Sequence, residues 1–244
     1  MAERLLLFRQ LAGSGGVARV NSAETPSGPA GAFLTFVENY APLAYGKGKT
    51  IPYLEGLEQT WRAYSEMGIF ESLNLVPMTR TEIIGKLGIA QSSLASRLSS
   101  LASAWRSKYS ESHQNPFEPL SYEPSQSFLS NNNRKYPPDG IQILILDYLA
   151  RGRESSELLH LASILGLGEA LEVMRKWLTI EQMIEKYGYT TFDVSRELEK
   201  LRDQQVFIPG GIKLRERQNG TGNNNDQRTF SPAGVKLIRK RLDK

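Results

Sequence analysis

Residues 178–201 read LTIEQMIEKYGYTTFDVSRELEKL and predict two short helices joined by a tight turn. Thr179 is a suitable N-cap for the first helix, in which Met183 and Ile184 share one face. Gly188 stands where the chain must turn sharply, because glycine tolerates a positive φ. Apolar residues recur at helical spacing in the second helix and are expected to pack inward: Val194, Leu198 and Leu201.

The segment that follows predicts a basic β-hairpin. Residues 212–217 (IKLRER) alternate apolar and charged side chains, which is the period of a strand. Residues 218–227 are rich in Asn and Gly and predict the hairpin tip, and residues 228–230 predict the return strand. A basic hairpin suits contact with phosphates or with a DNA minor groove. Its candidate DNA-contacting residues are Lys213, Arg215, Arg217 and Arg228.

Residues 78–101, MTRTEIIGKLGIAQSSLASRLSSL, repeat the order of helix, turn and helix. Gly88 is expected at the turn, and Leu94, Leu98 and Leu101 are expected to face the core. The opposite face carries small polar residues and one arginine, which suit close approach to a major groove and hydrogen bonds to base edges. The candidate DNA-binding residues here are Gln91, Ser92, Ser93, Ser96 and Arg97. The alternatives are an ordinary helical hairpin and a winged helix that serves protein contact.

The composition argues against several classes of site. The chain of 244 residues has no Cys and only two His, so Cys-based zinc sites, His-rich metal sites and disulfides are excluded. The Gly-rich stretch at residues 13–31 lacks both the Gly-Lys-Ser/Thr ending and the preceding strand of a phosphate-binding loop. We therefore expect no metal, no cofactor and no catalytic residues, and we do not expect an enzyme.

Positive charge is concentrated near the C-terminus. The net charge is +4, yet residues 201–244 hold ten Lys and Arg against four Asp and Glu. The 200 residues before them carry a small net negative charge. A basic end on a nearly neutral body suggests a polyanion as the partner of that end, although a solvated basic helix is an equally good interpretation of charge alone.

We expect a mainly α fold with small β-hairpin wings and two helix-turn-helix modules. Residues 1–31 are expected to form an N-terminal helix and a flexible segment, and residues 32–109 a helical domain with the first module. The stretch 110–140, rich in Pro, Ser and Asn, is expected to be a linker. Residues 141–244 would then form a C-terminal winged-helix domain. The apolar segment 141–150 is expected to be buried, either within its domain or in a dimer interface.

The C-terminal segment resembles the DNA-binding domain of MerR-type regulators. In that family a helix-turn-helix precedes a wing, and an Arg-aromatic-Ser/Thr junction leads into another helix. Residues 178–201, 212–230 and the sequence RTFSP at 228–232 match these parts in order. The resemblance implies that the exposed start of the second helix contacts DNA through Thr190, Thr191, Asp193 and Arg196. Residues 78–101 resemble the helix-turn-helix of many bacterial and archaeal regulators.

These observations favour a sequence-specific transcription regulator that binds double-stranded DNA as a homodimer. Reading of two adjacent groove segments by a monomer is an alternative arrangement. Other classes remain open: a replication initiator or partition protein of a mobile element, and a winged-helix adaptor for protein assembly. No apolar run approaches the ~20 residues that span a bilayer, and no signal-peptide pattern is found, so we expect a cytoplasmic protein without membrane contact.

Overall fold

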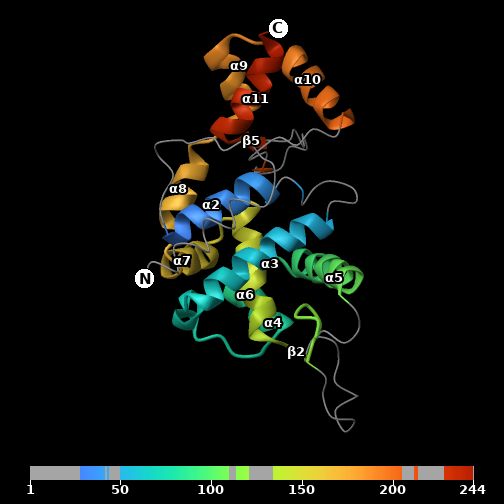
Figure 1. Ribbon diagram of the computed structural model, residues 1–244. Coiled ribbons are helices and arrows are strands. Elements are labelled where there is room, and N and C mark those ends of the chain that lie inside the picture. Colours follow the sequence, from blue (N-terminus) through green and yellow to red (C-terminus); the bar gives the residue numbers. More distant parts are fainter. Residues whose placement is uncertain are drawn as a thin grey trace. The chain divides into compact units, whose positions relative to one another are not determined.

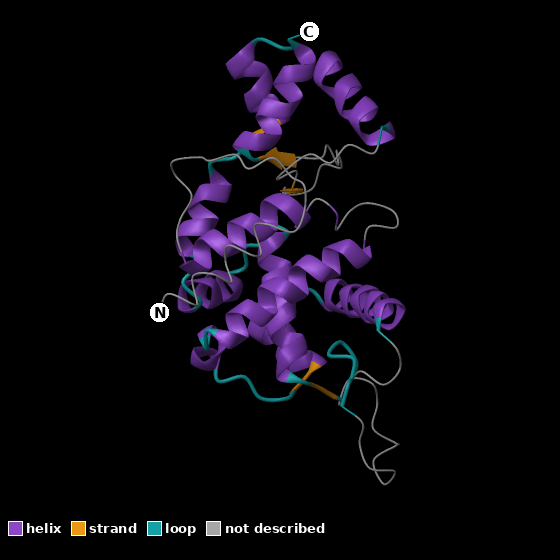
Figure 2. Cartoon of the chain, viewed as in Figure 1, coloured by secondary structure: helices purple, strands orange, loops and turns teal. Residues whose placement is uncertain are grey.

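The computed structural model describes residues 28–41, 43, 50–109, 114–120, 134–204, 212–213 and 228–243. Helices make up most of this chain, together with two small antiparallel sheets (Figure 2). The expectation of a mainly α fold is therefore confirmed. The helix expected near the N-terminus and much of the 110–140 segment lie outside the described residues.

Tertiary contacts divide the chain into two compact units. Unit 1 comprises Met1–Pro42, Ala150–Arg153 and Gly168–Lys244, and unit 2 comprises Leu43–Leu149 and Glu154–Leu167. This grouping joins the apolar 141–149 segment to the helices that precede it, whereas the sequence predicts a linker between them. It also joins the first helix of the described chain to the C-terminal part.

Unit 2 is a helical body with one two-stranded sheet (Figure 1). Its elements in chain order are α3 (Thr50–Glu66), η2 (Ile69–Leu73), β1 (Met78–Thr79), α4 (Arg80–Leu87), α5 (Gln91–Lys108), β2 (Lys135–Tyr136), α6 (Pro138–Ala150) and α7 (Ser156–Ile164). Helices α3, α4, α5 and α6 all contribute buried residues to the core, which includes Tyr53, Leu57, Ile83, Leu87, Leu94, Leu98, Leu101 and Leu144. Residues 143–150 of α6 are all buried within the chain, which accounts for a helix that is apolar nearly all round.

Unit 1 contains α2 (Gly28–Tyr40), α8 (Gly168–Arg175), β3 (Leu178–Thr179), α9 (Ile180–Tyr187), α10 (Thr191–Asp203), β4 (Ile212–Lys213), β5 (Arg228–Phe230) and α11 (Pro232–Leu242). Helix α2 packs on α8. Helices α9, α10 and α11 share a small core, whose buried residues are Met183, Val194, Leu201, Phe230, Val235 and Ile238.

In each sheet, a strand that precedes a helix pair forms an antiparallel pair with a strand that follows it. In unit 2, β1 pairs with β2, and Met78 lies opposite Tyr136. In unit 1 the strand order is β3-β5-β4, and Leu178 lies opposite Phe230. Strands β4 and β5 form the antiparallel hairpin that the alternating sequence predicts, with Ile212 opposite Thr229.

The two units contain an internal repeat. Residues 178–201 align with residues 78–101 at a constant offset of 100, and the elements coincide: a two-residue strand, a helix of eight residues, and a second helix that starts at Gln91 or Thr191. Six positions are identical in this alignment: Thr79/Thr179, Ile84/Ile184, Lys86/Lys186, Gly88/Gly188, Leu98/Leu198 and Leu101/Leu201. We call residues 78–101 repeat 1 and residues 178–201 repeat 2.

The likeness continues beyond each helix pair. Tyr136 closes the sheet of repeat 1 as Phe230 closes that of repeat 2, and a proline begins the next helix in both, at Pro138 and Pro232. Four further positions correspond in the first turns of α6 and α11: Gly140/Gly234, Ile141/Val235, Ile143/Leu237 and Leu144/Ile238. Both units therefore build the same strand-helix-helix-strand-helix arrangement from related sequences.

Candidate nucleic-acid interface

Local sequence sets the turn between α4 and α5. The Thr79 side chain accepts a hydrogen bond from the backbone N–H of Glu82, and the Glu82 carboxylate accepts one from the N–H of Thr79, which forms a capping box at the start of α4. Gly88 ends that helix with a φ of 61°, in the left-handed region. Thr179, Gln182 and Gly188 (φ 73°) reproduce both devices in repeat 2.

Helix α5 presents a polar and acid-free surface at its start. Gln91, Ser92 and Ser96 are exposed, as the sequence predicts. Ser93 is half-buried, and its hydroxyl lies 3.4 Å from that of Tyr148 on α6. No Asp or Glu occurs anywhere in α5 (QSSLASRLSSLASAWRSK). Side chains of this kind can approach base edges closely without electrostatic repulsion from phosphates.

The prediction that Arg97 lies on this outer face is wrong. Its side chain is only 8% exposed and forms an ion pair with Asp147 of α6. The Arg97 Nε donates to Asp147 Oδ2 at 2.8 Å, and the Tyr53 hydroxyl donates to Asp147 Oδ1 at 2.6 Å. Burial alone would lower the pKa of the guanidinium, but the charge of Asp147 raises that pKa above its usual range, so Arg97 stays charged. Arg97 therefore positions α5 from inside the unit.

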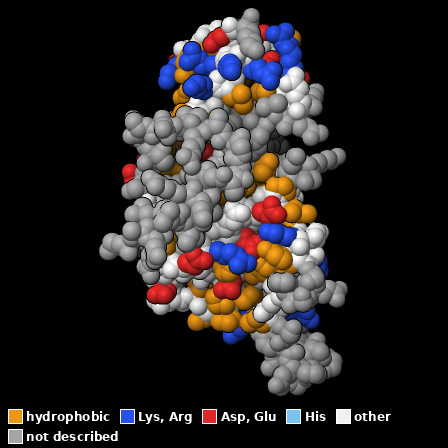
Figure 3. Space-filling view, viewed as in Figure 1, with side chains coloured by type: hydrophobic (Ala, Val, Ile, Leu, Met, Phe, Trp, Pro, Cys, Tyr) orange, Lys and Arg blue, Asp and Glu red, His pale blue; other side chains and the backbone are white. Residues whose placement is uncertain are grey.

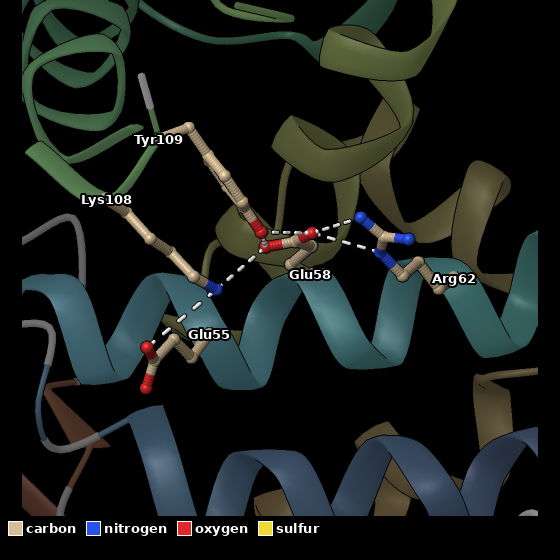
Figure 4. A network of polar contacts seen from close by, with 5 residues as sticks. All are labelled: Glu55, Glu58, Arg62, Lys108 and Tyr109. Atoms are coloured by element: carbon tan, nitrogen blue, oxygen red, sulfur yellow. Dashed lines mark hydrogen bonds and ion pairs between the residues drawn. The ribbon is translucent and has the colours of Figure 1, made fainter. Parts of the chain in front are cut away.

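A second buried carboxylate holds the C-terminal end of α5 against α3 (Figure 4). Glu58 is 3% exposed and accepts hydrogen bonds from the Tyr109 hydroxyl at 2.7 Å and from Lys108 Nζ at 3.0 Å. Arg62, one turn along α3, donates to the same carboxylate at 2.6 Å, and Glu55 lies 3.8 Å from Lys108 Nζ. Burial alone would raise the pKa of Glu58, but these hydrogen bonds outweigh it and lower the pKa.

Helix α7 covers the turn of repeat 1. The Ser155 hydroxyl donates to the carbonyl of Leu87 at 2.6 Å and also caps α7 by accepting from the N–H of Leu158. A Cβ added to Gly88 would lie 2.1 Å from the Glu157 carboxylate and 2.9 Å from Ser155 Cβ. At Gly188 the corresponding space is open. Helix α7 thus supports the turn of repeat 1. Together with the contacts of Asp147 and Glu58, it fixes α5 at its start, middle and end.

In repeat 2 the expected contact residues lie together at the start of α10. Asp193 Oδ2 accepts from the Thr190 hydroxyl at 2.6 Å, and Asp193 Oδ1 accepts from Arg196 at 3.2 Å. Thr191 is exposed beside them. Sequence reasoning missed their neighbour Phe192, which is 70% exposed. The signal available was that Phe192 does not share the helical spacing of the inward-facing Val194, Leu198 and Leu201.

The basic hairpin is described only in part. Lys213 lies in β4 and Arg228 in β5, on adjacent strands and directly opposite each other. Their side chains, and Arg215 and Arg217 as a whole, lie outside the described residues. The predicted role of these four residues therefore stays a prediction.

Helix α11 adds basic residues to unit 1. Lys236, Arg239 and Lys240 are exposed, and the Arg239 guanidinium lies 4.3 Å from the ring centre of Tyr187. Figure 3 shows Lys and Arg side chains gathered over the region of α9, α10 and α11, at the top of the view. Part of the positive charge concentrated at the C-terminal end of the sequence is thus exposed on α11.

No protein-family model matches the chain, and searches of the curated proteins and of the solved structures find no significant match. Within the described ranges, no three His, Asp or Glu side chains are grouped as a metal site. Across the same ranges, no helix has the length and apolar character needed to span a membrane.

Proposed function

We propose that this protein binds double-stranded DNA through two winged helix-turn-helix repeats and acts as a sequence-specific transcription regulator. One observation carries the proposal: α5 presents Gln91, Ser92 and Ser96 on an exposed surface of an acid-free helix. This helix follows a tight glycine turn, which is the position of a recognition helix. Gln can bond adenine through two hydrogen bonds, and Ser can bond bases or phosphates.

The rigidity of α5 supports this role. Base readout requires side chains to be held within a fraction of an ångström of their hydrogen-bonding positions. The buried carboxylates of Asp147 and Glu58 anchor the middle and the end of α5, and Ser155 anchors the turn before it. These contacts hold the helix independently of its exposed surface, so that surface is available for a partner.

Repeat 2 supplies the parts expected of a phosphate-contacting module. Its strand order β3-β5-β4 places a hairpin beside the helix pair, as in a wing, and the hairpin sequence carries Lys213, Arg215, Arg217 and Arg228. Helix α10 carries acids as well, among them Asp193, Glu197 and Glu199. This mixture is the observation that favours the alternative class, a winged-helix adaptor for protein assembly. A replication initiator or partition protein of a mobile element shares the proposed DNA chemistry.

The test is selection from random duplex DNA at ~0.15 M salt, using the full chain. We expect an enriched motif, and we expect the Gln91→Ala variant to lose preference at one position of that motif by about 1–3 kcal/mol. Ser103→Ala is the matched control, because Ser103 is also exposed on α5 but lies roughly 18 Å further along the helix. Equal selection by the wild type and Gln91→Ala would remove α5 from the interface.

Light scattering of the bound complex decides the arrangement. Two symmetric half-sites bound by a homodimer would support the regulator as first expected. One long asymmetric motif bound by a monomer would mean that the two repeats of one chain read DNA in tandem, and multiple repeated motifs would favour an initiator or partition protein. Absence of enrichment, with only weak salt-sensitive binding, would favour the adaptor.

A further inference from the structure

Phe192 is an isolated apolar side chain on a polar surface. It is the second residue of α10 and is 70% exposed, the highest value among the large hydrophobic residues that the structure describes. Its neighbours along the exposed side of the helix are polar: Thr190, Thr191, Ser195 and Arg196. An exposed phenyl ring leaves apolar area in water, and a partner that covered this area would gain hydrophobic free energy.

The Phe192 ring contacts the side chain of Arg196. The Arg196 guanidinium lies 5.4 Å from the ring centre of Phe192, within the range of a cation–π contact. Asp193 accepts a hydrogen bond from the same guanidinium and another from the Thr190 hydroxyl. Because a guanidinium has five N–H donors, this bond leaves others available for a partner. An aromatic ring and a charged donor are thus presented side by side.

The small extent of the exposed apolar surface, a single ring, favours one kind of partner over another. A protein interface buries about 800 Å² on each side and has an apolar core of several residues. Within repeat 2, Phe192 is the one large hydrophobic residue that is exposed. A thymine instead presents a single apolar group, its C5 methyl, among the polar base edges of the major groove. That target matches one ring beside one arginine.

Helix α10 carries four acids, so their pairing affects how closely this surface can approach phosphates. Asp193 is paired with Arg196, and Glu197 is buried and lies 3.4 Å from Lys200 Nζ. Two of the acids of α10 are thereby compensated within the helix, while the exposed side chains of α11 add positive charge to the same unit. The equivalent of Phe192 in repeat 1 is Ser92, on the surface proposed to contact DNA.

We propose that Phe192 packs against the C5 methyl of a thymine in the major groove, and that Arg196 donates to the guanine of a neighbouring base pair. The inference rests on the proposed DNA binding and assigns to repeat 2 a specificity of its own. A phenyl ring and a serine at equivalent positions would make the two repeats select different bases, so the composite target would be asymmetric.

The experiment removes the methyl group and the ring separately. The probe is the duplex enriched by the wild-type chain, prepared with each thymine in turn replaced by deoxyuridine. At one position the wild-type chain should lose about fourfold in affinity, the effect of one buried methyl group. The Phe192→Ala variant should bind the thymine and uracil duplexes within about 1.5-fold of each other at that position.

A matched control and two contrary outcomes complete the test. Val76→Ala removes another exposed hydrophobic side chain, 60% exposed in unit 2, and should leave the thymine effect intact. If the chain selects DNA but uracil substitution affects wild type and Phe192→Ala equally, the thymine contact is refuted while DNA binding stands. If no duplex is enriched and Phe192→Ala instead abolishes self-association, both proposals fail and the ring belongs to a protein interface.

Discussion

Arg97 of α5 and Asp147 of α6 form an ion pair that is buried in unit 2. The Arg97 Nε donates to Asp147 Oδ2 at 2.8 Å, and the Arg97 guanidinium lies 5.2 Å from the ring centre of Tyr53. The carboxylate of Asp147 is fully buried and receives the Tyr53 hydroxyl as well. Three helices therefore meet at one carboxylate, and its geometry determines how α5 is oriented.

Removal of Asp147 should destabilise unit 2 strongly. Asp147→Ala leaves the Arg97 charge buried without its partner, which typically costs about 3–5 kcal/mol of unfolding free energy. Urea denaturation followed by tryptophan fluorescence measures this loss. Asp139→Ala, at an exposed acid in the first turn of the same helix, should change the midpoint little. Equal midpoints for both variants would show that the pair does not contribute to the fold.

The two turn glycines should differ in their tolerance of a methyl group. Both adopt a positive φ, so Gly88→Ala and Gly188→Ala each incur about 1–2 kcal/mol of backbone strain. Gly88→Ala should cost more, because the new Cβ meets Glu157 and Ser155, whereas the space at Gly188 is open. Gly85→Ala, in open space within α4, should be neutral or stabilising by about 1 kcal/mol. A larger loss at Gly188 than at Gly88 would contradict the buttress formed by α7.

Acid should weaken the attachment of α5 to α3. The pKa of Glu58 is lower in the folded chain than in the unfolded chain, so its contribution is present above the unfolded pKa. That contribution is lost as the pH falls through the lowered folded pKa. Urea midpoints measured from pH 7 to pH 3 should fall less steeply for Glu58→Gln than for wild type. Glu66→Gln, an exposed residue of the same helix, should reproduce the wild-type slope.

Helix α6 should not tolerate a side chain at Gly140. A Cβ there would lie 1.9 Å from the backbone carbonyl oxygen of Pro116, which cannot rotate away as a side chain can. Gly140→Ala should therefore cost about 2–3 kcal/mol of unfolding free energy by forcing backbone shifts. Gly168→Ala, at the open first position of α8, serves as the control in the same denaturation assay. Equal stability of the two variants would refute the close packing of residues 114–120 on α6.

The basic hairpin of residues 212–230 should contribute to DNA binding through its positive charge alone. If the hairpin contacts phosphates, Lys213→Ala combined with Arg215→Ala should weaken binding to all duplexes and reduce the slope of log affinity against log salt by about two. Titration of one selected and one scrambled duplex at several salt concentrations measures both effects. Loss of affinity for the selected duplex only would show base contacts instead, and an unchanged slope would exclude the wing from the interface.

The helix-turn-helix pairs could be predicted from the sequence because residues close together in the chain specify them. A Thr cap, an apolar repeat of three to four residues and a glycine at the turn suffice to define each helix pair. Strand β4 was predicted from alternation, and β5 as the return strand of the hairpin. The internal repeat was also present in the sequence as a constant offset between residues 78–101 and 178–201. Comparison of the two segments position by position would have revealed it.

The alignment of the two repeats also indicates that Arg97 is buried. The positions that correspond to Arg97 and Asp147 are Glu197 and Arg241, with the charges exchanged. Glu197 is buried like Arg97, but it does not pair with Arg241: its carboxylate lies 3.4 Å from Lys200 Nζ. Arg241 donates a hydrogen bond to Gln204 instead. A charged residue at the same inward position in both repeats indicates that this position faces another helix and not solvent.

The sequence by itself determined where the helices and the turn of each repeat lie, since hydrogen bonds within a few residues and the period of apolar side chains specify them. Only the tertiary structure decided which polar side chains of α5 remain available to a partner. Arg97 and Ser96 are adjacent in the chain, yet Ser96 is exposed and Arg97 is buried. The difference comes from Asp147, fifty residues away, whose buried carboxylate requires a positive charge beside it.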